Sequence, residues 1–308
     1  MHYTLHQLKI FLSVHKTKSI TKAADDMHLT QPAISIQLKK LQDQFEIPLT
    51  EVIGRQLHIT DFGHKIAEIS TRILNEADGI KNMLNEYKGL LVGDLKISVV
   101  STGKYVMPYF LNGFISKHPG VNVSVDVTNR AKVIESLSKN ESDFSLVSVL
   151  PENIPIKRIE LMSNKIYLVS SAENQPAKAK LKFKDLHNLP IIYREQGSAT
   201  RAAMEKYITT NEIPVRKRLE LVSNEAVKQA VKAGLGYSIM PLIGLKNELH
   251  MKEMMIIPTE GLPIITSWNL IYNRDKRLSP AANALLEYIN EAKDQIMEKY
   301  FNWTEGVG

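Results

Sequence analysis

Residues 5–63 have the sequence LHQLKIFLSVHKTKSITKAADDMHLTQPAISIQLKKLQDQFEIPLTEVIGRQLHITDFG, and the spacing of their apolar side chains predicts consecutive short helices. Over residues 4–16, side chains at helical spacing form one face: Leu5, Leu8, Phe11, Leu12 and His15. Residues 19–27 predict a second helix, and Ser19 is placed to cap it. The stretch therefore begins with two helices joined by a tight connection.

A third helix is predicted from Thr30, which can cap it, to about Phe45. Proline in the first turn costs no hydrogen bond, so Pro32 fits there. The apolar stripe of this helix consists of Ile34, Leu38, Leu41 and Phe45. Its polar and basic side chains lie mostly off that stripe: Gln31, Ser35, Gln37, Lys39 and Lys40. Two short helices of this kind, the second with a polar and basic free face, are typical of a helix-turn-helix that enters the major groove of DNA.

Two strand-like runs flank a glycine turn over residues 52–60, and this pattern predicts a wing. From Asp61 to about Tyr87 a helical pattern continues without interruption, which is long for one globular helix. Since such a helix has an apolar stripe that needs a partner surface, it predicts a homo-oligomer, at least a dimer.

After Gly89 and Gly93 the chain alternates between strands and helices, which predicts a mostly parallel sheet. The predicted strands are residues 94–100, 121–127, 143–149, 165–171, 190–193, 218–222, 237–240 and 267–272. The predicted helices are residues 106–117, 132–138, 200–210, 224–233 and 280–299, and the tail after residue 300 is expected to fray. The fold class is therefore α/β behind a winged helix-turn-helix.

Composition limits the class of protein. The chain has 308 residues, of which 44% are hydrophobic and 23% charged, as expected of a globular protein with two or three domains. It has no cysteine, no run long enough to span a membrane and no signal peptide at its start, so we expect a cytoplasmic protein. The net charge is +6, but residues 1–60 hold seven basic and five acidic side chains, so charge alone does not single out a nucleic-acid-binding region.

The stretch 5–63 resembles the DNA-binding module of the LysR-type transcriptional regulators. Four of its motifs occur in the order and spacing of that family: QL followed by F, SITKAA, LTQPAIS and LHITDFG. The later segment VKQAVKAGLGYSIMP also resembles the family, so the resemblance covers nearly the whole chain. More narrowly, STGKYVMPYF at 101–110, Asn129-Arg130 and REQGSATR at 194–201 resemble the branch that regulates carbon-fixation operons.

This resemblance implies three parts: a DNA-binding domain at 1–60, a linker and dimerisation helix at 61–89, and an effector-binding domain at 90–308. It also implies that the homo-oligomer, a homodimer or homotetramer, is a homotetramer. The last part is expected to resemble periplasmic binding proteins, with lobe I at about 90–161 and 266–300 and lobe II at about 162–265. One departure concerns the wing, where the family's L-F-x-R is replaced by Leu49-Thr50-Glu51-Val52, although Arg55 is present.

For the partner, double-stranded DNA, the resemblance favours base contacts by Gln31, Pro32 and Ser35. Lys39 and Lys40 suit phosphates, and Arg55 at the wing suits a narrow minor groove. The full set of predicted DNA-binding residues is Ser19, Thr30, Gln31, Pro32, Ser35, Gln37, Lys39, Lys40 and Arg55. The alternative is a helix face that is merely solvated.

Hydroxyl and amide side chains recur where predicted strands end and helices begin, which is where open α/β sheets bind ligands. The predicted effector-binding residues are Ser101, Thr102, Thr128, Asn129, Ser148, Ser198, Thr200, Arg201 and Asn224. Helix N-termini attract negative charge, so we expect a small anion, a carboxylate or phosphate ester, bridged by Ser101 and Thr102 in one lobe and Arg201 in the other. The alternative is that each hydroxyl only caps a helix and that Arg201 forms a surface salt bridge.

Two other functions are alternatives: a solute-binding protein with an incidental helical extension, and an enzyme on the α/β lobes. The missing signal peptide argues against the first, and the missing catalytic signature against the second. Six of the nine histidines lie in the first 64 residues, but none has metal-ligand spacing, so no metal or cofactor is expected. Gly234 and Gly236 follow a predicted helix rather than a strand, so we interpret Gly234 as a helix C-cap, not a nucleotide-binding turn.

Overall fold

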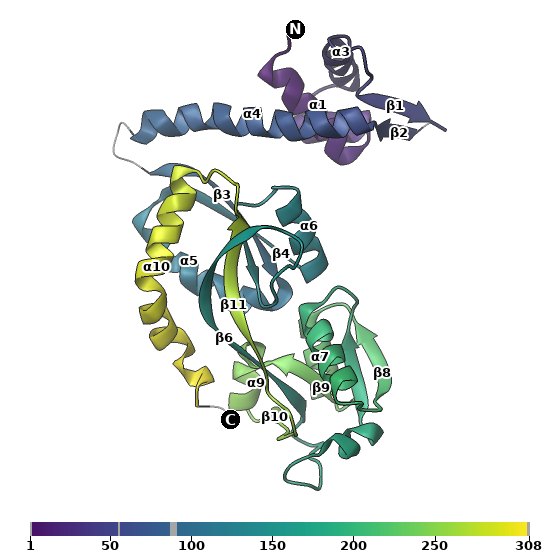
Figure 1. Ribbon diagram of the computed structural model, residues 1–308, viewed down its shortest axis with the longest axis vertical. Helices are drawn as coiled ribbons and strands as arrows, with labels where there is room; N and C mark the ends of the chain where they lie inside the picture. Colours follow the sequence, from purple (N-terminus) through teal and green to yellow (C-terminus); the bar gives the residue numbers. More distant parts are fainter. Residues whose placement is uncertain (1, 55, 87–90, 307–308) are drawn as a thin grey trace. The chain divides into compact units, whose positions relative to one another are not determined.

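The computed structural model describes residues 2–54, 56–86 and 91–306, with the side chains of 78–86 and of residue 188 left aside. The chain falls into two compact units, Met1–Gly89 and Leu90–Gly308, which are described separately. Figure 1 shows the elements of each unit along the chain.

The N-terminal unit has four helices and a two-stranded wing among its described residues. They are α1 (Leu5–Thr17), α2 (Ile20–Met27), α3 (Gln31–Gln42), β1 (Thr50–Ile53), β2 (Gln56–Ile59) and α4 (Asp61–Glu86). The wing strands are antiparallel, with Thr50 opposite Ile59, and Gly54 at their turn has a φ of +57° that favours glycine. The predicted helix-turn-helix, wing and long helix are all confirmed.

Side-chain caps fix where these helices begin. The Ser19 hydroxyl accepts a hydrogen bond from the Lys22 amide, and the Thr30 hydroxyl accepts one from the Ala33 amide, as the sequence predicted. Helix α3 stops at Gln42, three residues before the predicted end, because Phe45 turns to pack against Phe62 of α4, with ring centroids 5.7 Å apart.

The core of this unit is built from one face of each helix. Its fully buried side chains include Ile10, Phe11, Val14, Ala23, Ile34, Leu41 and Leu49. The start of α4 packs closely on this core at Gly63, where a Cβ atom would lie only 2.1 Å from the Leu49 carbonyl oxygen. Any larger side chain at this position would push α4 away from the segment that leads into the wing.

The C-terminal unit is organised around a seven-stranded sheet of order β10-β6-β11-β5-β3-β4, in which β9 also pairs with β6. Its strands are β3 (Val92–Val100), β4 (Gly120–Thr128), β5 (Phe144–Val147), β6 (Ile156–Ser171), β9 (Ser238–Pro241), β10 (Met254–Ile256) and β11 (Ile264–Asn273). Only β5, β3 and β4 run parallel, and the other pairs are antiparallel. The expectation of a mostly parallel sheet was wrong, because β6 and β11 are long returning strands that pair with each other.

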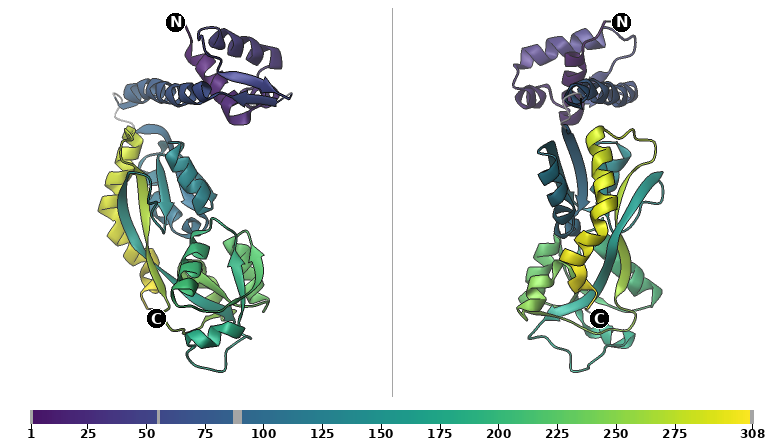
Figure 2. Two further views of the ribbon diagram at one scale, coloured as in Figure 1. Left: turned by 45° about the vertical axis from the view of Figure 1, so that its right-hand side comes forward. Right: turned by 90° about the vertical axis from the view of Figure 1, so that its left-hand side faces the viewer.

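Helices cover both faces of the parallel part of this sheet. Right-handed crossovers in opposite directions place α5 (Met107–Lys117) and α6 (Arg130–Ser138) on opposite faces. Helix α10 (Pro280–Phe301) packs beside α5, as Figures 1 and 2 show. The C-terminal segment is not frayed as expected: Phe301 and Thr304 are buried, and Trp303 packs on the core, which holds the chain in place through residue 304.

A second lobe surrounds the far ends of β6 and β11. It adds a parallel pair, β7 (Pro190–Arg194) and β8 (Arg216–Leu221), with helices α7 (Ala199–Thr210), α8 (Asn224–Lys232) and α9 (Lys246–His250). Gly234 follows α8 with a φ of +75°, as expected of a C-cap. Strand β6 contributes Leu161 and Met162 to the core of the first lobe and Ile166 and Leu168 to a core of the second, so it passes from one lobe to the other.

Candidate functional site

Helix α3 presents a polar and basic face to solvent. Ile34, Leu38 and Leu41 fix its buried side, since they recur every three or four residues. Of the predicted DNA-binding residues on α3, five lie away from that side: Gln31, Pro32, Lys39 and Lys40 are exposed and Ser35 is half-buried. This arrangement leaves amide, hydroxyl and ammonium groups free to meet base edges and phosphates.

The other predicted DNA-binding residues are placed differently. Gln37 lies toward α1, where its Oε1 accepts a hydrogen bond of 3.3 Å from the Gln7 side chain. The hydroxyls of Ser19 and Thr30 accept hydrogen bonds from backbone amides as helix caps. Arg55 lies outside the described residues. We therefore centre the candidate surface on the five α3 residues and leave Gln37 out of it.

In the first lobe, three predicted effector residues lie at one edge of the sheet. Thr128 ends β4, Ser101 follows β3, and Ser148 follows β5. These strands are adjacent and parallel, with Val100 opposite Thr128, so their carboxyl ends meet at the same edge. Thr102, next to Ser101, is buried. The sequence prediction that these side chains converge is supported by this register.

The second lobe presents a similar edge. Strands β7 and β8 are parallel, with Arg194 opposite Leu221, and each leads into a helix. Ser198 caps α7, while Thr200 lies buried in its first turn. Asn224 begins α8 and is only 2% exposed, yet neither its Nδ2 nor its Oδ1 atom has a hydrogen-bond partner. A buried amide without partners is costly, so this position is suited to a ligand that supplies both a donor and an acceptor.

The two lobes meet through Arg194, which lies in the REQGSATR motif but is not among the predicted effector-binding residues. Its Nη2 atom donates to the Ser101 hydroxyl across the lobes at 3.2 Å. Its Nε and Nη2 atoms also bind both carboxylate oxygens of Glu195, at 2.8 and 3.0 Å. The side chain is 3% exposed and its Nη1 atom has no partner. The edge of the guanidinium formed by Nε and Nη2 is thus occupied. The buried Nη1 atom, with its two N–H groups, remains free to bind a ligand.

Arg201, the predicted anion ligand, is engaged elsewhere. Its guanidinium binds the Glu205 and Glu220 carboxylates at 2.7 and 2.9 Å and donates to the Arg194 carbonyl oxygen at 3.0 Å. The hydrogen bond to Glu205, aided by the one to Glu220, raises the pKa of Arg201. An anion would have to displace two carboxylates, so the structure favours Arg194 in the role that we expected of Arg201. Arg201 instead stabilises the backbone at Arg194, through its hydrogen bond to the Arg194 carbonyl oxygen.

Two further contacts join the lobes. Asn129 caps α6 and lies beside the loop before α7, where a Cβ atom on Gly197 would be 3.8 Å from the Asn129 Nδ2 atom. The Tyr105 hydroxyl, in the first turn after β3, donates to Glu225 of α8 at 3.3 Å. Burial is the main cause that raises the pKa of Tyr105, so this donor stays protonated at neutral pH.

Glu225 is half-buried and belongs to a charge cluster around the buried side chain of Lys228. Lys228, with 8% of its side chain exposed, binds Glu225 at 3.0 Å and Glu248 at 2.9 Å. Burial opposes its charged form, but hydrogen bonds to Glu248 and Glu225 outweigh burial and raise the pKa of Lys228. The single ammonium group of this cluster is paired with two carboxylates, so the cluster holds Tyr105 in place and offers no free cation to an anion.

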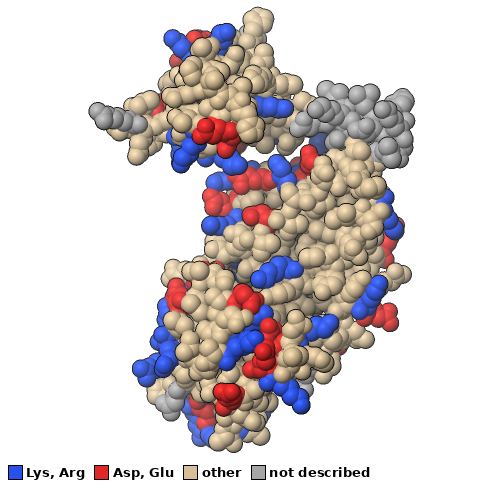
Figure 3. Space-filling view, turned by 180° about the vertical axis from the view of Figure 1, so that it is seen from behind, with Lys and Arg blue, Asp and Glu red and all other residues tan. Residues whose placement is uncertain are grey.

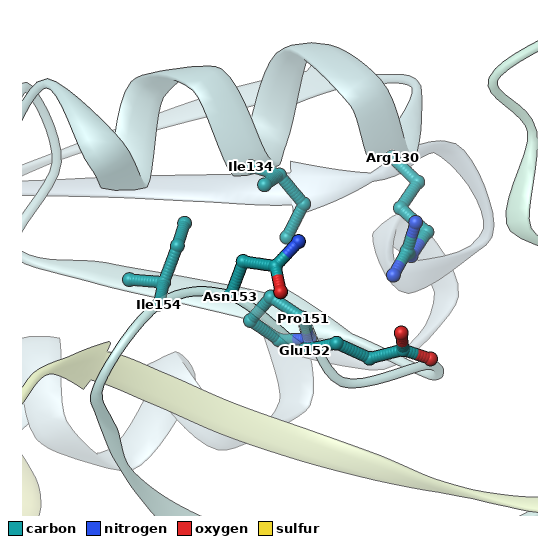
Figure 4. A pocket seen from close by; sticks show the side chains of 6 residues that line it. All are labelled: Arg130, Ile134, Pro151, Glu152, Asn153 and Ile154. Carbon is teal, nitrogen blue, oxygen red and sulfur yellow. The ribbon is translucent and has the colours of Figure 1, made fainter.

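A separate surface pocket of about 300 Å³ lies beside α6 (Figure 4). It is lined by Arg130, Ile134 and the loop 151–154. The Arg130 guanidinium donates to the Val149 and Leu150 carbonyl oxygens, so its visible role is to hold that loop. None of the predicted effector residues lines this pocket, and we keep it apart from the interlobe site.

Neither the charges on the face seen in Figure 3 nor the metal-binding side-chain types among the described residues indicate another site. On the face seen in Figure 3, acidic and basic side chains are interspersed over the C-terminal unit rather than gathered by sign. His15 and His64 form a pair, with Nε2 and Nδ1 2.9 Å apart, but the described residues contain no group of three or more side chains that could hold a metal ion. Among those residues there is also no helix long and apolar enough to cross a membrane.

Comparisons with known proteins match both units. Residues 5–64 match the bacterial regulatory helix-turn-helix proteins of the lysR family, and residues 88–294 match the LysR substrate binding domain. The chain belongs to the LysR family. This regulator is thus a DNA-binding transcription factor with an effector-binding domain, as the sequence predicted.

The relatives of this LysR-family regulator include proteins named for carbon-fixation operons. The transcriptional activator CmpR of Synechocystis sp. is 34% identical over 287 residues, 93% of this chain and 94% of its own. The RuBisCO operon transcriptional regulator of Allochromatium vinosum is 34% identical over 290 residues, 94% of this chain and 96% of its own. The predicted branch of the family is confirmed by these relatives.

Solved structures show the same fold. The regulatory domain of Synechocystis PCC6803 CcmR, in complex with 2-PG, has a TM-score of 0.61 and 32% identity, and covers 68% of this chain and 98% of its own. Full-length CbnR with its target DNA has a TM-score of 0.66 at 21% identity, covering 94% of this regulator and 99% of its own chain. The second likeness concerns the fold alone.

Proposed function

We propose that the regulator binds its operator through the exposed face of α3 and that a small anion with two acidic groups, 2-phosphoglycolate or a close analogue, controls it from the interlobe site. The observation that carries the ligand proposal is a pair of buried, unpartnered groups at the adjacent ends of β7 and β8 in the second lobe: the Nη1 atom of Arg194 and the amide of Asn224. Groups of this kind are rare in native proteins unless a ligand or water completes them.

The chemistry of the site fits a phosphate ester with a carboxylate. Ser198 and Ser223 begin α7 and α8, so two helix N-termini present amide groups and positive dipole ends at one edge. Ser101 and Thr102 add hydroxyls from the other lobe, and Arg194 supplies the cation. The 32% identical CcmR domain was solved with 2-PG, which supports this ligand class.

A ligand in the interlobe site can change the affinity for DNA, because its hydrogen-bond donors come from both lobes. A ligand held by Ser101 in one lobe and Arg194 in the other favours the arrangement in which those lobes are close. If that arrangement and the open one hold the helix-turn-helix units of the oligomer differently, the ligand shifts the population of DNA-competent molecules by its difference in affinity.

Titration calorimetry of the full-length protein tests the ligand. We expect 2-phosphoglycolate to bind the wild type, with glycolate and inorganic phosphate each weaker by about tenfold or more, since each lacks one of the two anionic groups. Ser101→Ala removes one interlobe hydroxyl and should weaken binding. Binding of neutral or cationic metabolites in preference to all anions would contradict the ligand class.

Titration of promoter DNA separates DNA binding from the other two functions considered. We expect specific retardation of a promoter fragment by the full-length protein, and none by residues 90–308.

We further propose that the regulator acts in the cytoplasm, that it is not an enzyme and that it is a homodimer or homotetramer. We also propose that residues 1–60, 61–89 and 90–308 are its three functional parts. Family membership and the α4 helix support these proposals.

A further inference from the structure

Ile36 lies in the middle of the open face of α3, and 54% of it is exposed. At about 100° per residue, it is on the side of the helix opposite Ile34. It is also absent from the hydrophobic side chains that pack on the core of the N-terminal unit, over the residues that the structure describes. The fold therefore gives this isoleucine no packing role.

The surroundings of Ile36 are polar and basic. Pro32 and Lys40 lie one turn before and after it on the same face, and Lys39 is also exposed. Pro32 and Ile36 are only two exposed apolar side chains, whereas an apolar patch that binds another protein typically covers several hundred Å². The two lysines suit a polyanion. The occupant must therefore be anionic overall and must offer one small apolar group to the helix.

The major groove of DNA offers one such group. Among the base edges there, only thymine presents a methyl group, at C5, and apolar side chains of recognition helices contact it. We propose that Ile36 contacts a thymine methyl group and so makes the regulator select thymine at one position of each half-site. This inference rests on the proposed binding of DNA through α3, and it adds the base and the atom that this side chain recognises.

Replacement of thymine by uracil tests the contact, because it removes the methyl group and leaves the hydrogen-bonding edge unchanged. The full-length protein is first used to select duplexes from a random library, and each thymine of the selected sequence is then replaced singly by uracil. We expect at least one position at which uracil weakens binding by about fourfold, the effect of one buried methyl-sized group. Ile36→Ala should bind the thymine and uracil duplexes equally at that position.

Ile265→Ala provides the matched control, since Ile265 is also an exposed isoleucine, at 66%, but lies on β11 of the other unit. This variant should lose as much affinity as the wild type when thymine is replaced by uracil. The proposal is overturned if no thymine is sensitive to uracil, or if Ile36→Ala shows the same sensitivity as the wild type. Failure of the wild type to select any sequence would instead overturn the proposed function, together with this inference.

Discussion

At the scale of single residues, two arginines seven positions apart have different surroundings. Arg194 keeps a free Nη1 atom at the interlobe contact, whereas Arg201 is bound to two carboxylates. We expect Arg194→Gln to weaken binding of 2-phosphoglycolate by tenfold to a hundredfold, since hydrogen bonds to charged groups contribute about 1.5–3 kcal/mol. Arg201→Gln should change the affinity by less than about threefold.

Calorimetry on both variants measures this difference, with circular dichroism to show that each is folded. Since Arg194 is buried, Arg194→Lys serves as a second variant that keeps the positive charge while losing the fixed geometry of the guanidinium. Equal losses for Arg194→Gln and Arg201→Gln would contradict the assignment of the anion to Arg194.

On α3, exposed side chains of different chemistry should have different effects on DNA binding. Gln31→Ala and Ser35→Ala should each lower the ratio of operator to random-DNA affinity, because a base contact is lost. The corresponding loss of discrimination free energy is about 1–3 kcal/mol. Lys39→Ala should weaken binding to both DNAs alike and reduce the salt dependence by about one phosphate contact. Gln37→Ala is the matched control, because its side chain bonds Gln7 of α1.

Fluorescence anisotropy on operator and random duplexes over a series of salt concentrations measures both quantities. Unchanged affinity ratios in Gln31→Ala and Ser35→Ala, with folding intact, would show that α3 does not contact the bases.

The side-chain roles were only partly predictable from sequence. The hydroxyls of Ser101, Thr128 and Ser148 could be grouped because strand ends in a parallel sheet meet at one edge. Arg194 was passed over for Arg201, since which of two neighbouring arginines faces the other lobe depends on packing between lobes that are distant in sequence. Ile36 was not considered because it lies among polar residues and outside the apolar periodicity of α3.

At the scale of elements, α4 has two kinds of apolar residue. Ile73 packs on the core of its own unit, while Ile69 is 43% exposed. We propose that Ile69 lies in the contact between protomers, so Ile69→Glu should release dimers or monomers from the oligomer; it should leave the helix-turn-helix folded, because Ile69 is outside the core of its own unit. Ile73→Glu should destabilise the unit itself, since it buries an unpaired charge.

Sedimentation equilibrium at micromolar concentration, together with thermal unfolding, separates the two effects. The oligomer prediction fails if the wild type sediments as a monomer, and the assignment of the interface to Ile69 fails if Ile69→Glu keeps the wild-type mass.

Element boundaries show where sequence periodicity succeeds and where it does not. The caps at Ser19 and Thr30 placed two helix starts correctly, since a side-chain oxygen can be recognised without knowledge of tertiary contacts. The first half of β6, residues 156–164, was missed because charged residues interrupt its apolar pattern and its pairing comes from β11, about one hundred residues later. Strand direction was misjudged for the same reason.

At the scale of the whole C-terminal unit, the Tyr105–Glu225 hydrogen bond links the lobes. Burial raises the pKa of Glu225, but hydrogen bonds from Gln229, Lys228 and Tyr105 outweigh burial and lower it overall. A carboxylate with a lowered pKa adds stability above its unfolded pKa, and that stability is lost as pH falls through the lower, folded value. Glu225→Gln should therefore reduce the free energy of unfolding at neutral pH and lessen the stability that is lost as the pH falls through and below the ordinary glutamate pKa of 4.5.

Thermal unfolding followed across this pH range in wild type and Glu225→Gln measures the change. Glu173→Gln is a control, because that carboxylate is exposed and the structure gives it no ion pair. Identical pH profiles for wild type and Glu225→Gln would show that the interlobe cluster does not contribute to stability.

Strands β6 and β11 run through both lobes, paired over ten positions of β11 with a register shift between Trp268 and Asn269. The lobes are thus joined by a hydrogen-bonded ribbon rather than by slack loops. Such a ribbon resists stretching but tolerates torsion, so lobe movement is confined to twisting and bending, softest near the irregular step where the ladder is interrupted. If the proposed anion draws the lobes together, we expect this ribbon to twist, to store elastic energy as a torsion spring does, and to return the lobes when the anion leaves.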